Sequence, residues 1–554
     1  MNELWYGDNL TIMQERMGKD SVDLIYLDPP FKSDANYNLL YKTMTGKPVP
    51  EQVHAFCDTW EMDAQKEAVA RSMPILLREY GVDDYYAEFW RLWMNALRKA
   101  RPHLLAYLTF MVQRLLHMKT ILRPRGSIYL HCDPAASHYI KVMMDGIFGH
   151  QNFRNEIIWK RTGAHGRAKR WGPIHDTILF YTKSDQYTWN RVFEEYDKDY
   201  LEKFYRSKDG KGQYQPISLT GPGTRAGSSG QPWRGVDPTP GGRHWELPPD
   251  RALPSWFEFP QGYAQMDCQD RLDVLDKAGL IYWPKRGSVP RFKRYAAVAG
   301  GNPVQDLITD IGPLTAHSGE RMGYPTQKPI ALLERIIQAS SNEGDIVFDP
   351  FCGCGTSIYA AHKTGRQWKG CDIAILSIKL IRERLAEKYR LVEGSDFVVN
   401  GIPMSVDGAQ ELFNKSPHTF QTWLTERVGG FPMTQTSGDR GIDGRIYFET
   451  STGLSQMILQ VKGGKTVRPT DVRDLRGTLE REEGAELAGF LSMVPPSRAM
   501  LAEAAEAGVY EYMGVKYPRM QFLTVQQILE ERREFHMPAK VGTKIATGQQ
   551  SLAL

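Results

Sequence analysis

Hydrophobic residues in the first 180 positions fall into short continuous runs separated by stretches of helical periodicity. The runs 22–27, 126–131 and 177–181 have the length of buried strands. Between the first two, apolar and aromatic residues recur at helical spacing over residues 85–122, with a break expected near Pro102. This alternation of strands and helices predicts a doubly wound, mostly parallel α/β sheet.

The same alternation resumes after residue 320 and again in the last third of the chain, whereas residues 36–84 are polar and predict an irregular inserted loop. With 554 residues the chain is too long for one core. The predicted organisation is the first half of an α/β domain over 1–149, an inserted region over 150–320, the second half of the same domain over 321–399, a C-terminal α/β domain over 400–537 and a disordered tail over 538–554.

Composition narrows the class of protein. The net charge is only +4, so a nucleic-acid surface would have to be a local patch. The six cysteines are scattered, which favours reduced thiols over a zinc site or a disulfide framework. No signal peptide and no apolar run long enough to cross a bilayer is visible, so we expect a cytoplasmic protein without a membrane partner.

The strand at 22–27 ends abruptly in Asp28-Pro29-Pro30-Phe31. Neither proline can donate a backbone hydrogen bond, so Asp28 is placed at the carboxyl end of a strand, where open α/β sheets bind ligands. Taken alone, the motif is also compatible with an ordinary strand-to-loop turn.

Asp28-Pro29-Pro30-Phe31 resembles the signature of DNA methyltransferases that methylate exocyclic amino groups. The resemblance implies that Asp28 and the Pro29 carbonyl accept hydrogen bonds from the amino group, and that Phe31 stacks on a flipped-out base. It also implies that S-adenosylmethionine is the methyl donor.

A second motif lies far downstream. The strand at 345–348 ends in Asp349, and a glycine-rich turn with Gly353 and Gly355 follows. Strand, glycine turn and helix form a geometry in which backbone approaches a nucleotide-like ligand closely. Asp372 ends the next strand about 20 residues after the first glycine, the offset at which an acid meets ribose hydroxyls.

This second stretch is similar to the S-adenosylmethionine loop of DNA methyltransferases. The resemblance implies that Asp349 faces the methionine amino group. It also implies a set of further cofactor-binding residues, namely Phe351, Gly353, Gly355, Thr356, Asp372, the flank Lys328-Pro329, and Asp8 beside the adenine ring. Asp8 also suits a helix cap and Lys328 a surface lysine.

The order of the two motifs is similar to that of the beta class of amino-methyltransferases, which includes the modification subunits of type III systems. An acid at the head of the motif favours adenine N6 over cytosine N4 in that class, and N4 methylation stays as the alternative. Duplex DNA is the implied partner, and a homodimer or a separate restriction subunit is compatible with the resemblance. A small-molecule or RNA methyltransferase is a broader rival.

Basic and aromatic residues crowd together between about 150 and 320, as in Trp233-Arg234 and in residues 291–295. Positive charge interleaved with flat rings suits phosphate contact and base stacking, so this region is expected to bind DNA. A solvated loop region with a satellite core is the alternative.

The C-terminal domain carries Asp443 in a glycine turn and a strand that ends in Gln460-Val461-Lys462. The pattern resembles the Mrr-like branch of restriction endonucleases. The resemblance implies Mg²⁺ held by Asp443 and Gln460, with Lys462 neutralising charge on the phosphate. Gln421 stands where that family carries a helix glutamate, which leaves Glu426 as a substitute ligand. A domain that only grips DNA, or a plain surface turn, is the alternative.

Overall fold

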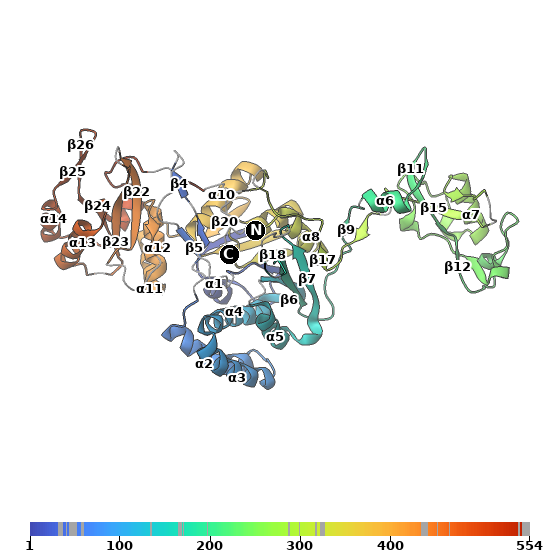
Figure 1. Cartoon of the computed structure of the whole chain (residues 1–554), viewed down its shortest axis with the longest axis horizontal. Coiled ribbons are helices and arrows are strands. Elements are labelled where there is room, and N and C mark those ends of the chain that lie inside the picture. Colours follow the sequence, from blue (N-terminus) through green and yellow to red (C-terminus); the bar gives the residue numbers. More distant parts are fainter. Residues whose placement is uncertain are drawn as a thin grey trace. The chain divides into compact units, whose positions relative to one another are not determined.

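A mixed, nine-stranded sheet organises the larger of the two units into which the computed structural model divides the chain. This unit comprises residues 1–190 and 306–554, and the smaller comprises residues 191–305 (Figure 1). The structure describes residues 1–30, 37–39, 41–43, 53–56, 60–132, 136–163, 169, 171–196, 198–285, 289–298, 300–315, 318–321, 327–433, 441–450, 453–464, 466–540 and 543–545.

The sheet has a central parallel block and one antiparallel strand. Its order across the described residues is β17 (Leu307–Ile308), β7 (Phe153–Lys160), β8 (His175–Thr182), β6 (Leu122–Cys132), β2 (Val22–Leu27), β18 (Ile346–Asp349), β19 (Gln367–Asp372), β1 (Asn2–Tyr6) and β20 (Phe397–Asn400). Only β8 runs against its neighbours β6 and β7. The predicted α/β sheet is therefore present, and two distant segments supply its adjacent strands β2 and β18.

Helices cover both faces of this sheet. Figure 1 shows α4 and α5 on one side and α8 and α10 on the other. The first layer contains α1 (Asn9–Arg16), α4 (Pro102–Ile121) and α5 (Ser137–Phe148), and the second α8 (Ile330–Ser340), α9 (Thr356–Lys363) and α10 (Ile375–Tyr389). Ile25 belongs to the first core and Tyr26 to the second, because successive side chains of a strand point to opposite faces. In the part of the chain that the structure describes, every helix is too short or too polar to cross a bilayer.

Residues 36–84, expected to be irregular, contain the helix α2 (Ala64–Glu79), which Asp63 caps. The α2 helix packs against α3 (Asp84–Ala100), and Trp90 Nε1 donates a hydrogen bond to the Ala70 carbonyl at 2.8 Å. Short strands β3 (Tyr37–Leu39) and β5 (Val53–Phe56) pair within the same stretch. The long helical stretch breaks before Pro102, as predicted.

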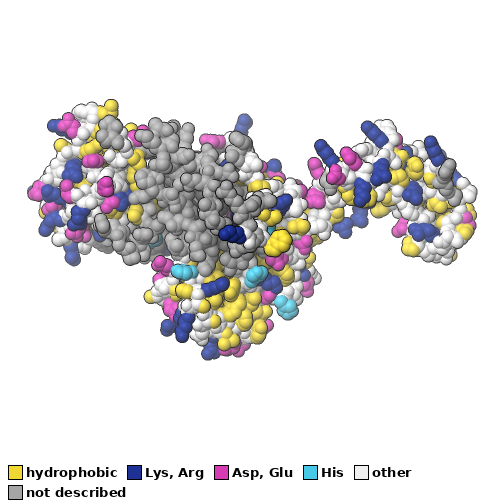
Figure 2. All heavy atoms as spheres, in the orientation of Figure 1, with side chains coloured by type: hydrophobic (Ala, Val, Ile, Leu, Met, Phe, Trp, Pro, Cys, Tyr) yellow, Lys and Arg dark blue, Asp and Glu magenta, His cyan; other side chains and the backbone are white. Residues whose placement is uncertain are grey.

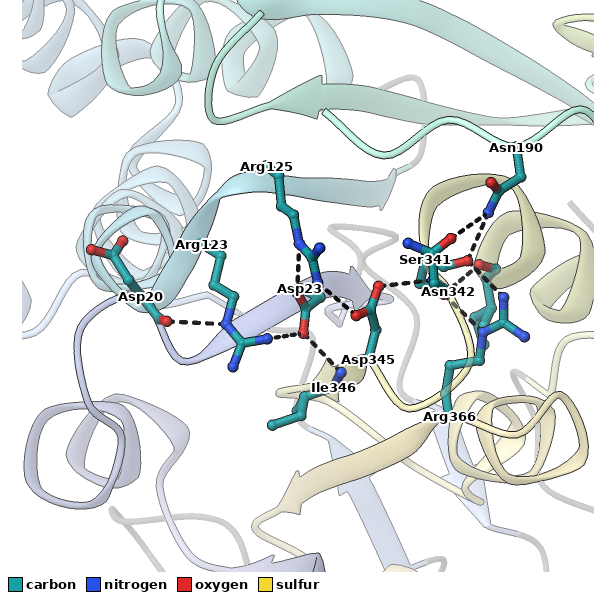
Figure 3. A network of polar contacts seen from close by, with 11 residues as sticks. Asp20, Asp23, Arg123, Arg125, Asn190, Ser341, Asn342, Asp345, Ile346 and Arg366 are labelled. Atoms are coloured by element: carbon teal, nitrogen blue, oxygen red, sulfur yellow. Dashed lines mark hydrogen bonds and ion pairs between the residues drawn. The ribbon is translucent and has the colours of Figure 1, made fainter. Parts of the chain in front are cut away.

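An ion-pair network holds together the amino-terminal ends of the central strands (Figure 3). Asp23 of β2 is almost fully buried and accepts hydrogen bonds from Arg123 at 2.5 Å, from Arg125 at 3.1 Å and from the Ile346 N–H at 3.0 Å. Arg125 also pairs with Asp345. These contacts align β2, β6 and β18, so their opposite ends lie at one edge.

Residues 191–305 form the smaller unit, which is narrower than the predicted 150–320 because β7, β8 and β17 belong to the main sheet. Its antiparallel sheet has the order β10 (Ser207–Asp209), β11 (Gly212–Ser218), β15 (Arg291–Tyr295) and β14 (Ile281–Tyr282). The remaining elements are β9 (Phe193–Glu194), α6 (Lys198–Phe204), β12 (Thr220–Pro222), β13 (Arg243–Trp245), α7 (Cys268–Lys277) and β16 (Asn302–Pro303).

The C-terminal part contains its own five-stranded sheet. The order is β21 (Phe431–Pro432), β22 (Gly444–Thr450), β23 (Gly453–Lys462), β24 (Ala485–Ser492) and β27 (Met520–Thr524). Its helices are α11 (Val406–Lys415), α12 (Pro417–Arg427), α13 (Pro469–Arg481), α14 (Arg498–Ala505) and α15 (Val525–Leu529), with a hairpin of β25 (Val509–Tyr512) and β26 (Val515–Pro518). The tail, predicted to be disordered from 538, contains β28 (Thr543–Ile545), which pairs with β4 (Tyr41–Thr43).

Candidate active site

Two cavities lie at the carboxyl edge of the main sheet, where β1, β2, β18 and β19 end. Asp28 and Asp349, 321 residues apart, line the first cavity together with Phe351, Gly353 and Thr356. Parallel strands bring their carboxyl ends to the same edge, which explains why such distant segments converge. The structure therefore places the two motifs in one pocket.

Asp28 presents one engaged and one open oxygen to this cavity. Oδ2 forms an ion pair with the Lys328 ammonium, and the two side chains are 16% and 10% exposed. Oδ1 is buried and has no hydrogen-bond partner among the described residues. A buried acceptor without a donor is costly unless a ligand supplies one, so this oxygen marks a place for an N–H group.

Lys328, predicted to flank the cofactor, lies against the carboxylate of the first motif, and Pro329 is the residue before α8. Pro29 is buried and Pro30 lines the second cavity. Phe31, predicted to stack on the target base, lies outside the described residues.

The glycine-rich loop is held by the acid that precedes it. Asp349 accepts hydrogen bonds from the Phe351 N–H at 2.9 Å and from the Ser357 hydroxyl. Burial, together with the charge of Asp28, raises the pKa of Asp349 to about 7 despite these two bonds, which lower it. A carboxyl group buried in this way gains from a cationic ligand.

Glycine is required at the end of this loop. Gly355 has a φ of 81°, in the left-handed region that L-residues rarely adopt. A Cβ there would stand 2.7 Å from Ile381 Cγ1. The loop backbone can therefore lie this close to α10 only because the residue has no side chain.

Asp372 at the end of β19 ties the loop to the next strand. It accepts hydrogen bonds from the Gly353 N–H at 2.8 Å and the Ala374 N–H at 2.9 Å. Burial raises the pKa of Asp372 to about 6, although these bonds lower it. The Ser377 side chain and the Ile373 N–H also hydrogen-bond to this carboxylate, which lines the second cavity.

Asp8 lines the second cavity with Phe110, Phe351 and Asp372. It caps α1 through the Thr11 N–H at 3.1 Å, and it also pairs with Arg114 at 2.6 Å. The predicted helix cap at Asp8 is confirmed, and its location beside the second cavity is compatible with cofactor contact. Sequence reasoning missed Phe110 and Arg114, because both lie in a mostly buried helix whose pattern signals packing only.

The aromatic rings of residues 191–305 divide between the core and the surface. Trp233, Trp245 and Phe292 belong to the core of this unit and are not free to stack on bases, whereas Trp256 and Phe259 are exposed. Its charged residues remain outside, and Figure 2 shows Lys and Arg side chains spread over the visible face. Arg291 on β15 is an exposed basic residue of this unit.

The C-terminal candidates only partly converge. Asp443, just before β22, accepts hydrogen bonds from the Gln421 side chain and, at 2.6 Å, from the Val461 N–H. Gln460 on the adjacent strand has a buried Oε1 without a partner among the described residues. Lys462 lies 3.9 Å from Asp471.

Glu426 lies elsewhere. It accepts a hydrogen bond from the Ile375 N–H at the start of α10, and burial raises the pKa of Glu426 to about 8. Gln421, not Glu426, is therefore the helix residue beside Asp443. Within the described ranges, no three His, Cys, Asp or Glu side chains gather to hold a metal.

Comparisons with known proteins agree with the geometry of the main sheet. Residues 22–383 match a family described as DNA methylase, the N6 and N4 methyltransferases. The chain is 34% identical over 282 residues to the type II methyltransferase M.EcaI of Enterobacter cloacae, covering 51% of this chain and 58% of that protein. It is 26% identical over 368 residues to the StyLTI Mod subunit, from a type III restriction-modification enzyme of Salmonella typhimurium, covering 64% of this chain and 48% of that protein.

Among solved structures, the cytosine-N4-specific PvuII DNA methyltransferase aligns over 71% of this chain and 88% of its own, with 10% identity and a TM-score of 0.33. The chain thus spans about half the length of the two relatives that it matches in sequence.

Proposed function

The chain belongs to the DNA methylase family of N6 and N4 methyltransferases, and from that premise we propose that it transfers the methyl group of S-adenosylmethionine to adenine N6 in duplex DNA. The observation that carries the proposal is Asp28 Oδ1, which has no partner among the residues that the structure describes and faces the cavity that Asp349 and the glycine loop also line. An acceptor for an amino group and a buried acid suited to an ammonium group share one pocket.

The residues present fit the methyl donor. S-adenosylmethionine supplies, when bound, an electrophilic methyl group on a sulfonium. Asp349 would hold its amino group, since burial favours pairing of this carboxyl group with a cation. Asp372 would accept from its ribose hydroxyls, and Gly355 allows the loop that lines the cavity to pack against α10.

Asp28 has a positioning role on the other substrate. Its free Oδ1 would accept a hydrogen bond from the exocyclic amino group, which draws the nitrogen lone pair out of conjugation with the ring. The Lys328 ammonium holds the second oxygen and so fixes the direction of the first. The base would reach this edge only after leaving the helical stack.

The Asp28→Ala variant tests this assignment. It should bind S-adenosylmethionine with near wild-type affinity by calorimetry, yet lose methyl transfer to plasmid DNA by about 10²-fold or more, because the acceptor for the amino group is gone. Asp185→Ala is a matched control, since Asp185 is 82% exposed and forms only a surface ion pair. Normal methylation by Asp28→Ala would remove the assignment.

Adenine N6 is proposed over cytosine N4 because an acid heads the motif at Asp28. The two products differ in the modified base, so nucleoside analysis of methylated DNA distinguishes them. If the product is N4-methylcytosine, the same arrangement of residues acts on the exocyclic amino group of cytosine instead of that of adenine. Duplex DNA is the proposed partner, with residues 191–305 contributing basic surface.

A second candidate function concerns the C-terminal sheet, where Asp443 directly precedes β22 and Gln460, whose Oε1 has no partner among the described residues, lies on the neighbouring strand β23. We propose Mg²⁺-dependent DNA cleavage there, with Asp443 and Gln460 as ligands and Lys462 at the phosphate. The ion supplies Lewis-acid activation of the phosphodiester.

Asp443→Ala should stop metal-dependent strand breakage and leave methylation intact. Breakage that is equal in this variant, or independent of Mg²⁺ in the wild type, would leave the alternative of a domain that only binds DNA.

A further inference from the structure

A continuous chain of hydrogen bonds leads away from the Asp28 cavity through the interior of the sheet. The Tyr26 hydroxyl lies 3.1 Å from His131 Nδ1, and His131 Nε2 lies 3.1 Å from Asp176 Oδ2. The other oxygen of Asp176 pairs with Arg161 Nε at 3.1 Å. Three adjacent strands, β2, β6 and β8, supply the tyrosine, the histidine and the aspartate.

This chain of hydrogen bonds is buried over most of its length. Tyr26, His131 and Asp176 are 2%, 0% and 4% exposed, and only Arg161 reaches the surface. Trp159 covers the His131 ring in an edge-to-face contact with centroids 6.0 Å apart. A buried polar chain of this kind is costly unless every member is satisfied.

The direction of these bonds follows from charge. Although burial raises the pKa of Asp176, the hydrogen bond from His131 and the charges of Arg161 and Lys328 hold it below its ordinary value. Ionised Asp176 only accepts, so His131 Nε2 carries a proton. In a neutral imidazole Nδ1 is then an acceptor, and the Tyr26 hydroxyl donates to it.

Tyr26 also belongs to the catalytic pocket. It precedes Asp28 by two residues and therefore points to the same face of the sheet, and both line the first cavity. Burial raises the pKa of Tyr26 well above its ordinary value, and the charges of Asp28, Asp349 and Asp176 add to this. A free phenolate does not accumulate there, so any proton that Tyr26 accepts must be matched by one that it gives up.

Resting on the proposed function, we propose that Tyr26, His131 and Asp176 form the proton acceptor of the methyl transfer reaction. As the N–CH₃ bond forms and the S–CH₃ bond breaks, the amino nitrogen becomes cationic. It loses one proton to the Tyr26 oxygen while the phenolic proton of Tyr26 moves to His131 Nδ1. The products are a neutral methylamino group and an imidazolium paired with Asp176. The proton returns to water through Tyr26 when the pocket opens.

A neighbouring tyrosine shows what a purely structural role looks like. Tyr129 pairs in register with Tyr26 across β2 and β6 and is equally buried, and its hydroxyl lies 2.6 Å from Ser340 Oγ. No titratable group continues from Ser340 among the described contacts of Tyr129, and Tyr129 does not line the cavity. Tyr129→Phe is thus the matched control for Tyr26→Phe.

Single-turnover methylation with saturating enzyme and S-adenosylmethionine, followed from about pH 5.5 to 8, tests the proposal. The wild-type rate should fall at low pH, because the group that receives the amino proton has to be unprotonated before the transfer. Tyr26→Phe and His131→Asn should each be about 10²-fold slower, within the usual contribution of general base catalysis, and should lack this fall. Tyr129→Phe should stay within about threefold of the wild type.

Each remaining outcome overturns a definite statement. A wild-type protein that binds the cofactor but methylates no DNA contradicts the proposed function itself. An active wild type with Tyr26→Phe at full rate, or with the wild-type pH profile at a lower rate, contradicts the relay alone. If His131→Asn fails to bind S-adenosylmethionine, Tyr26→Phe, which removes a single oxygen, decides the question. Equal slowing by Tyr129→Phe also refutes the relay.

Discussion

Protonation of Asp349 should control the affinity for S-adenosylmethionine. The buried carboxyl group has a pKa of about 7 without ligand, and an ammonium group beside it would keep it ionised in the complex. Binding therefore has to remove a proton wherever the free protein holds one, and affinity falls as the pH falls through 7. A carboxylate with a depressed pKa would lose affinity in the same direction but only at a lower pH, so the raised pKa of Asp349 is what moves the change into the range near pH 7.

The magnitude follows from the fraction of free protein that is protonated. With a pKa of about 7, the dissociation constant should rise about eightfold between pH 7.5 and pH 6, or about 1.2 kcal/mol. Asp372, with a pKa of about 6, adds about a further factor of two if the ribose hydroxyls need its ionised form. Near pH 6, close to one proton should be released at Asp349 on binding.

Isothermal titration calorimetry in two buffers of different ionisation enthalpy measures both the affinity and the proton release. 5′-Methylthioadenosine, which keeps the ribose but lacks the amino group, should show only the smaller change. The Asp349→Asn variant should bind S-adenosylmethionine weakly and with little pH dependence. Equal dissociation constants at both pH values, or an equal loss for both ligands, would refute the role of Asp349.

Two further substitutions test the loop and the far edge of the sheet. Gly355→Ala should weaken cofactor binding measured by calorimetry, because a left-handed residue with a side chain costs about 1–2 kcal/mol and its Cβ would meet Ile381 at 2.7 Å. Gly344→Ala is the control and should bind normally, because Gly344 has a similar φ of 83° but nothing lies within 4 Å of its added Cβ. Asp23→Ala should lower the free energy of unfolding by about 2–4 kcal/mol in denaturant titrations, because two half-exposed arginines and a backbone N–H lose a buried charged acceptor, and an unchanged midpoint would contradict that estimate.

Much of the main domain could be predicted from local patterns. The apolar run that ends at Asp28 and the strand, turn and helix around Gly353 are short-range signals, because strand period, proline geometry and glycine conformation act within a few residues. The order of these two motifs along the chain led us to expect that they meet in one site. The helix α2 was missed because residues 64–79 combine charged positions with a proline, and its packing against α3 supplies what the local pattern lacks.

Which side chains contact one another, in contrast, was decided by tertiary structure. Lys328 pairs with Asp28, and Gln421 rather than Glu426 reaches Asp443. The rings in residues 191–305 look the same in sequence whether they stack on bases or fill a core.

The sequence by itself determined which segments are strands and which residue types stand at their ends. Only the fold decided which of those ends share a pocket, which oxygen stays open and that a histidine on β6 connects Tyr26 to Asp176. The physical reason is range. Backbone preferences act between neighbours, whereas a contact across 105 residues depends on the register and the face of every strand between the two partners.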